Sequence, residues 1–129
     1  AKEANSAPSI GKLLTNGGNL SVVVGVGTSP GLPDQKIDES GYWSDGERVH
    51  FNASLLAFDA ETGGALNWTW TAPPYRRPAA KGDYLPEHAC RPSAWSLGVI
   101  GGDATYYVGH MSGKLFALRD SNGDGFVSE

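Results

Sequence analysis

The feature that most constrains the fold of this chain is an internal repeat. The segment that begins at residue 8 matches the segment that begins at residue 92 without a gap over 18 positions, seven of which are identical. Composition alone would give about one identity over that length. The chain therefore contains two copies of one unit. The identical pairs are Pro8 and Pro92, Ser9 and Ser93, Leu13 and Leu97, Gly17 and Gly101, Gly18 and Gly102, Val24 and Val108, and Gly25 and Gly109.

Both copies have the pattern of short strands separated by turns. β-branched and aromatic residues fill positions 20–26 and 105–108, and a Gly-Gly-Asn or Gly-Gly-Asp turn precedes each run. Eighteen glycines and eight prolines in 129 residues disfavour long helices. Tandem four-stranded antiparallel units are the blades of a β-propeller, so we predict an all-β fold of about two blades. The expected strands are residues 20–26, 54–59 and 65–71 in the first copy and residues 95–100, 105–110 and 114–119 in the second.

The first copy carries an insertion. Gly25 lies 32 residues before Ala57, whereas Gly109 lies eight residues before Ala117, so the first copy is 24 residues longer. The extra residues fall at about 28–50. Insertions between blade strands tend to build the binding face of a propeller. A decorative loop or a lid over a neighbouring blade is an equal alternative.

A proline-rich stretch joins the two copies. It contains four prolines together with Arg76, Arg77 and Lys81, which can contact an acidic partner or simply face solvent. Two blades cannot close a ring, so we expect the chain to be part of a longer protein or to be completed by other chains. The predicted organisation is a first blade at 1–71, an interblade linker at 72–91 and a second blade at 92–129.

Charge and hydropathy exclude two classes of partner. Ten Lys and Arg against 14 Asp and Glu give a net charge of −4, which provides no basic field for a nucleic acid backbone. The longest apolar run, residues 20–26, is far shorter than the roughly 18 residues of a membrane span. Cys90 is the single cysteine, so a disulfide would need another chain, and His88 beside it lacks two further ligands for a metal site.

One twelve-residue motif, AxDxxTGxxxxW, begins at Ala57 and is the most specific in the chain. Asp59 and Thr62 can cap a turn through their side chains, and Gly63 accepts a left-handed backbone. Ala57 permits close packing, and Trp68 fills an apolar slot. At this spacing the motif resembles the tryptophan-docking motif of quinoprotein alcohol dehydrogenase propellers. The resemblance implies that the indole of Trp68 packs between neighbouring blades and has a structural role.

The resemblance extends over most of residues 8–129 and implies candidate cofactor residues. In quinoprotein alcohol and methanol dehydrogenases, a GxGN segment ends the strand that residues 22–26 resemble, and its Asn ligates the calcium that holds pyrroloquinoline quinone (PQQ). Gly27 and Thr28 occupy that place here, and a hydroxyl is a weaker calcium ligand than an amide carbonyl. The family's general base is an Asp after the docking Trp, and Asp83 is the candidate that matches it loosely.

The end of the second copy has the opening of a calcium-binding loop, DxNxDG. Oxygens at alternate positions converge on one ion, and the glycine allows the sharp turn. The alternative is an ordinary polar hairpin in which Asp and Gly serve only turn geometry. The candidate ligands are Asp120, Asn122, Asp124, the Phe126 carbonyl and Ser128.

Sequons for N-glycosylation begin at Asn19, Asn52 and Asn67. Together with the calcium-type loop and the family resemblance, they favour an extracellular, periplasmic or organelle-lumen location.

Two functions of different class follow from the sequence. The one we favour is a non-catalytic propeller scaffold or accessory subunit, stabilised by calcium, whose partners are further blades or other protein chains. Residues 28–50 and 72–91 would contact them. The alternative is a PQQ- and calcium-dependent alcohol or sugar dehydrogenase, with Asp83 as its base and Gly27 and Thr28 near the cofactor. Thr28, in place of the ligating Asn, favours the scaffold.

Overall fold

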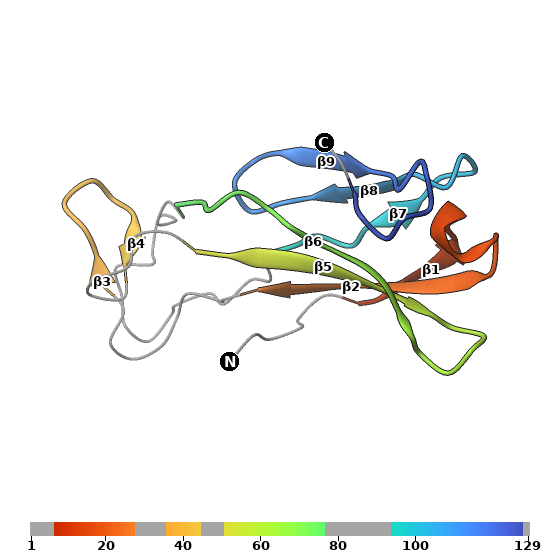
Figure 1. Cartoon of the computed structure of the whole chain (residues 1–129). Helices are drawn as coiled ribbons and strands as arrows, with labels where there is room; N and C mark the ends of the chain where they lie inside the picture. Colours follow the sequence, from red (N-terminus) through yellow and green to blue (C-terminus); the bar gives the residue numbers. More distant parts are fainter. Residues whose placement is uncertain (1–6, 28–35, 45–50, 77–93, 128–129) are drawn as a thin grey trace.

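The chain folds into two stacked antiparallel β-sheets (Figure 1). The computed structural model describes residues 7–27, 36–44, 51–76 and 94–127. Sheet 1 has the strand order β1-β2-β5-β6, and all its neighbours are antiparallel. The predicted all-β, antiparallel class is therefore confirmed. The strands of sheet 1 are β1 (Ser9–Lys12), β2 (Leu20–Gly27), β5 (Ala53–Asp59) and β6 (Leu66–Thr71).

Sheet 2 belongs to the second copy and has the strand order β7-β8-β9 in the described residues. A separate small hairpin, β3 and β4, lies beyond one end of sheet 1 (Figure 1). One turn of 3-10 helix, η1 (Leu14–Asn16), follows β1. The remaining strands are β7 (Val99–Ile100), β8 (Tyr106–Gly109), β9 (Leu115–Leu118), β3 (Lys36–Ile37) and β4 (Trp43–Ser44).

The strand register reproduces the sequence repeat. Val23 pairs with Ala57 in sheet 1, and the matching Tyr107 pairs with Ala117 in sheet 2. The insertion therefore lies between β2 and β5 and leaves the pairing of these strands unchanged. The repeat fails at the edge strand, because the partner of Val23 is Ser9 whereas the partner of Tyr107 is Val99. Val99 lies six positions beyond Ser93, the residue that matches Ser9.

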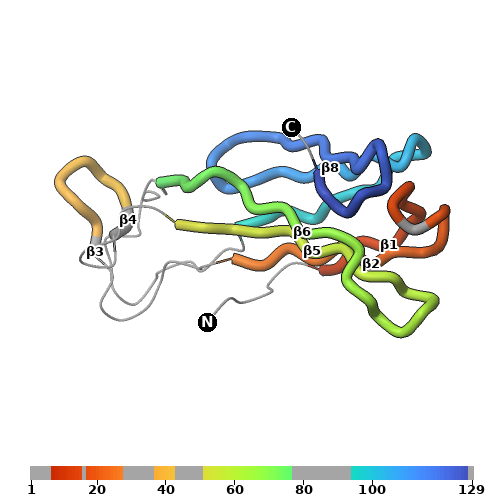
Figure 2. The backbone as a smooth tube through the Cα atoms, viewed as in Figure 1, coloured from red at the N-terminus to blue at the C-terminus, as the bar shows by residue number. Residues whose placement is uncertain are grey.

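The two sheets pack face to face, and the core lies between them (Figure 2). A Cβ atom on Gly25 would lie 2.6 Å from Cδ1 of Trp95, and one on Gly11 would lie 2.9 Å from Cδ1 of Ile100. Only glycine allows the sheets this close an approach. Trp70 of sheet 1 packs against Trp95 and Phe116, with ring centroids 6.2 and 4.9 Å away. These rings hold the two copies together.

The prediction of one continuous strand at residues 95–100 is wrong. Trp95 forms only an isolated bridge with His110, and a regular strand begins at Val99. The reason is that the Ser96 hydroxyl, not a ladder carbonyl, accepts a hydrogen bond from the Gly109 N–H at 3.0 Å. The phenol of Tyr106 also packs against Gly98 so closely that a Cβ atom there would clash with it.

Candidate functional site

The hairpin β3–β4 lies inside the predicted insertion and is held by its own turn. The Asp38 N–H donates to the Tyr42 carbonyl at 2.8 Å, and the Asp38 carboxylate accepts the N–H groups of Ser40 and Tyr42 at 2.9 and 3.0 Å. Gly41 supplies the left-handed backbone, with φ of 78°. The backbone hydrogen bond from Tyr42 is the largest influence on the carboxyl and lowers the pKa of Asp38. Asp38 is therefore an anion at neutral pH.

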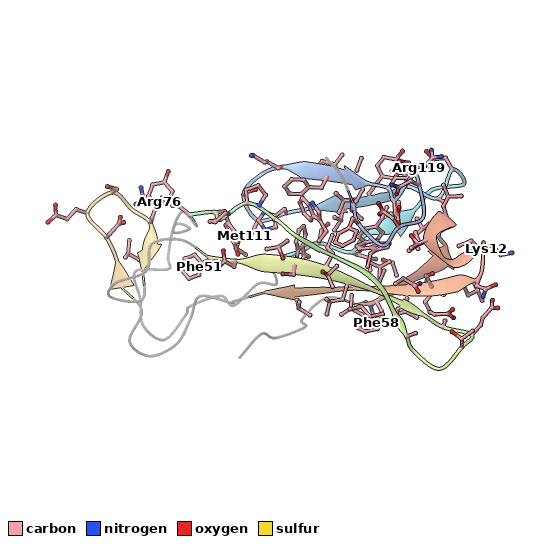
Figure 3. The ribbon with its side chains drawn as sticks, viewed as in Figure 1. Lys12, Phe51, Phe58, Arg76, Met111 and Arg119 are labelled. Carbon is pink, nitrogen blue, oxygen red and sulfur yellow. The ribbon has the colours of Figure 1, made fainter. Side chains whose placement is uncertain are left out.

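Arg76 fixes this hairpin against the end of β6. Its guanidinium donates to Oδ2 of Asp38 at 2.7 Å and lies 4.1 Å from the ring centroid of Tyr42 (Figure 3). The two charged side chains are 37% and 25% exposed, so solvent screens their attraction and the pair adds little to stability. Its main effect is positional, because it joins part of the insertion to the start of the proline-rich segment. We call Asp38, Tyr42 and Arg76 the insertion edge.

Core residues support the segment that carries Arg76 of the insertion edge. Tyr75 immediately precedes Arg76, and its backbone N–H and carbonyl pair with those of Phe51. The Tyr75 ring contacts the Phe51 ring at 6.0 Å and the His110 ring at 4.4 Å. Both sheets therefore brace the segment that carries Arg76, which is the arrangement of a surface loop on a rigid scaffold.

His110 is a buried neutral base in this support. Its ring lies 4.5 Å from that of Trp95 and 5.7 Å from that of Phe116. Nδ1 accepts the N–H of Ser112 at 3.2 Å, while Nε2 is buried without a hydrogen-bond partner in the described part of the chain. Burial first, and then the charge of Lys114, lower the pKa of His110 to about 4. The sequence assigns His110 no role, and no spacing signals one, because its partners come from distant segments.

The docking motif builds a tight turn at the end of β5. Oδ1 of Asp59 accepts the N–H groups of Glu61 and Thr62 at 2.7 and 2.9 Å, and Gly63 has φ of 93°. Ala57 is fully buried and pairs with Trp68, which is 3% exposed and belongs to the core between the sheets. Trp68 is therefore a core residue in this structure, and its blade-docking role stays a prediction.

The calcium-type loop is organised by its own hydrogen bonds. The Asp120 carboxylate accepts the N–H groups of Gly123 and Gly125 at 2.8 and 2.9 Å. The amide nitrogen of Asn122 donates to Oδ2 of Asp124 at 2.7 Å, and Oδ1 of Asp124 accepts the Phe126 N–H at 2.8 Å. The described residues contain no group of three or more His, Cys, Asp and Glu able to hold a metal. The carboxylate hydrogen bonds show that Asp120 and Asp124 stabilise the turn, and calcium binding stays a prediction.

The calcium hypothesis predicts that millimolar calcium raises the Tm by about 4 °C or more. It also predicts that Asp124→Ala removes this response, because the variant lacks one of the candidate carboxylates. Thermal unfolding followed by circular dichroism, with and without a chelator, measures both. An original chain with the same Tm in chelator and in millimolar calcium would contradict the hypothesis and leave Asp120 as a turn residue only.

Of the cofactor and base residues that the family resemblance implies, the structure describes Gly27 alone. Gly27 is buried, and a Cβ atom there would lie 2.9 Å from Cβ of Ala94. Sheet packing therefore accounts for the glycine. Thr28 and Asp83 lie outside the described residues, and so do Arg77, Lys81, His88, Cys90 and Ser128. The predictions about these residues stay open.

The three sequons differ in their surroundings. Asn52 is exposed and Asn19 is half-buried. The Asn67 amide is half-buried and donates to the Ser21 hydroxyl at 3.3 Å. Among the three, Asn52 is the most open to modification.

A pocket of about 410 Å³ lies at the end of the sheets opposite to the insertion edge. It opens between the loop after β1 and the turn after β7, with Leu13, Leu14 and Ile100 as apolar walls and Lys12 at its rim. These two loops match each other in the sequence repeat. This match in the repeat is the sequence signal that relates the two loops.

Comparisons with protein-family models, with curated proteins and with solved structures find no match to this chain. In the part of the chain that the structure describes, no helix is long and apolar enough to cross a membrane.

Proposed function

We propose that this chain is a non-catalytic scaffold, a section of a β-propeller, that binds a protein partner at its insertion edge. The observation that carries the proposal is the attachment of the β3–β4 hairpin to the two-sheet core through Arg76. Unbraced loops lose conformational entropy when a partner orders them, and that loss weakens binding. A hairpin held by an ion pair and a cation–π contact has already lost part of this freedom.

The chemistry of the edge also suits a protein partner. Arg and Tyr are enriched at the centres of protein interfaces, because each combines a flat apolar surface with hydrogen-bonding groups. Arg76 remains 37% exposed at its side chain, and its Nε is buried without a hydrogen-bond partner within the described ranges. Exposed Glu39 and Ser40 flank the pair at the turn of the hairpin and would form a polar rim.

Replacing Arg76 by alanine is expected to weaken partner binding on the order of tenfold or more. The hairpin would lose its attachment to β6, while the sheets would keep their core. Lys12→Ala is the matched control, because it removes one cation at the opposite end of the molecule (Figure 3). The measurement uses the full chain as bait in an extract of its source, followed by titration of the captured protein by interferometry.

Unchanged affinity of Arg76→Ala for the captured protein would contradict the proposal. Equal losses in Arg76→Ala and Lys12→Ala would do the same, because they would show an effect of charge alone. Circular dichroism of both variants establishes that each is folded.

A further inference from the structure

The two sheets are stacked, and in the described residues each has a second apolar face that no other sheet covers. In sheet 1, the residues that face sheet 2 include Val23 and Leu55, both fully buried. The opposite face of sheet 1 is also apolar. We call it outer face 1, and Phe58 marks it on the side away from sheet 2 (Figure 3). Outer face 1 consists of Ile10, Val22, Val24, Leu56 and Phe58, which are neighbours through the pairs Ile10 with Val22, Val22 with Phe58, and Val24 with Leu56.

Sheet 2 has an uncovered apolar face of its own. Tyr106, Val108 and Leu118 point into the core and are at most 3% exposed. The alternate positions along the same strands point away from sheet 1. We call this surface outer face 2. It consists of Val99, Tyr107, Gly109, Leu115 and Ala117, neighbours through the pairs Val99 with Tyr107, Tyr107 with Ala117, and Gly109 with Leu115.

The repeat relates each outer face to an inner face of the other sheet. Outer face 2 matches the inner face of sheet 1, because Tyr107 corresponds to Val23 and Leu115 to Leu55. Leu55 is 0% exposed, whereas Leu115 is 73% exposed. The one position is covered by sheet 2, and nothing in the described residues covers the other.

Outer face 1 matches the inner face of sheet 2 in the same way. Val24 corresponds to Val108. Val24 pairs with Leu56 and Val108 pairs with Phe116, and these partners occupy matching positions of the next strand in each copy. Val108 is 1% exposed, and Val24 is half-buried. The two uncovered faces are therefore repeat copies of the two faces that already pack against each other in the core.

We propose that outer face 2 of one chain binds outer face 1 of a second copy of the same chain, head to tail. The proposal rests on the scaffold function above and names a partner for its sheet faces, separate from the insertion edge. The contact between the two sheets within one chain provides the template, because it joins the same two kinds of face. An interface of this kind joins two different patches and so continues into a ring or an open stack, depending on the angle between neighbours.

The test uses one variant for each face. Leu115→Asp places a charge on outer face 2, and Ile10→Asp places one on outer face 1, at side chains that are 73% and 66% exposed. Neither change burdens the core, and circular dichroism checks that both variants fold. Leu14→Asp, at an apolar side chain that is 45% exposed and belongs to neither outer face, is the control. Sedimentation velocity over a hundredfold range of concentration measures association of the full chain.

Three results are expected together. The original chain and Leu14→Asp associate as concentration rises. Each single-face variant associates at least tenfold more weakly, and an equal mixture of the two variants forms dimers and nothing larger. The mixture restores one interface, because Ile10→Asp retains outer face 2 and Leu115→Asp retains outer face 1. Isologous pairing predicts a different result, since the variant that keeps the self-pairing face intact would then dimerise alone.

A chain that stays monomeric throughout the range would overturn the proposal, as would association that neither variant weakens. This failure is distinct from failure of the scaffold function. If Arg76→Ala still weakens partner binding while the chain stays monomeric, only the pairing of copies is wrong.

Discussion

Replacing Trp70 by alanine will lower the free energy of unfolding by about 3–5 kcal/mol, the range for a large buried aromatic side chain. Trp70 is 7% exposed and is the residue of sheet 1 that contacts both Trp95 and Phe116 of the second copy. The cavity would open between the sheets, where the close approach at Gly25 leaves little backbone freedom to refill it. Urea unfolding followed by far-ultraviolet circular dichroism measures the change.

The control for this prediction is Trp70→Phe, which keeps an aromatic ring in the slot and is expected to cost less than half as much. A loss below about 1 kcal/mol in Trp70→Ala would contradict the structure, because it would mean that the two sheets do not depend on each other. Cooperative unfolding of both copies in a single transition is the companion expectation, since one shared core joins them.

The central strand pairs could be predicted from the sequence because their signals are local. The run of β-branched residues from Leu20 and the Asp-x-x-Thr-Gly turn after β5 specify two strands and the turn that follows. The repeat then transfers the same pairing to β8 and β9. The repeat does not predict the edge strand of sheet 2. Ser96 supplies a side-chain hydrogen-bond acceptor there, whereas Lys12, its match in the first copy, has none.

The insertion edge shows why the candidate site was only partly predictable. The position of the insertion follows from counting residues between matched glycines, and the cation cluster that contains Arg76 stands out in the sequence. The contact between Arg76 and Asp38 joins residues 38 positions apart, and no local pattern specifies such a pair. The aromatic surroundings of His110 have the same origin, because Tyr75 comes from the predicted linker and Trp95 from the start of the second copy.

His110 will make the protein less stable as the pH falls from about 6.5 to about 4. Its folded-state pKa is lowered from 6.5 to about 4, so in this window the unfolded chain binds a proton that the folded chain refuses. The free energy of unfolding therefore has its full value above pH 6.5 and declines by up to about 3 kcal/mol as the pH approaches 4. Carboxyls with lowered pKa values, such as that of Asp120, add their own losses mainly below this window.

His110→Gln isolates the effect, because it keeps a polar side chain next to Ser112 and cannot be protonated. The variant is expected to be less stable than the original chain at pH 7, since its amide leaves the aromatic cluster of Tyr75, Trp95 and Phe116 incompletely filled. The difference in stability should then narrow as the pH falls toward 4. Urea unfolding at matched pH values measures this difference, and the carboxyl contributions cancel in it. A difference in stability that stays constant between pH 6.5 and 4 would contradict this prediction. It would show that His110 binds a proton as readily in the folded chain as in the unfolded chain.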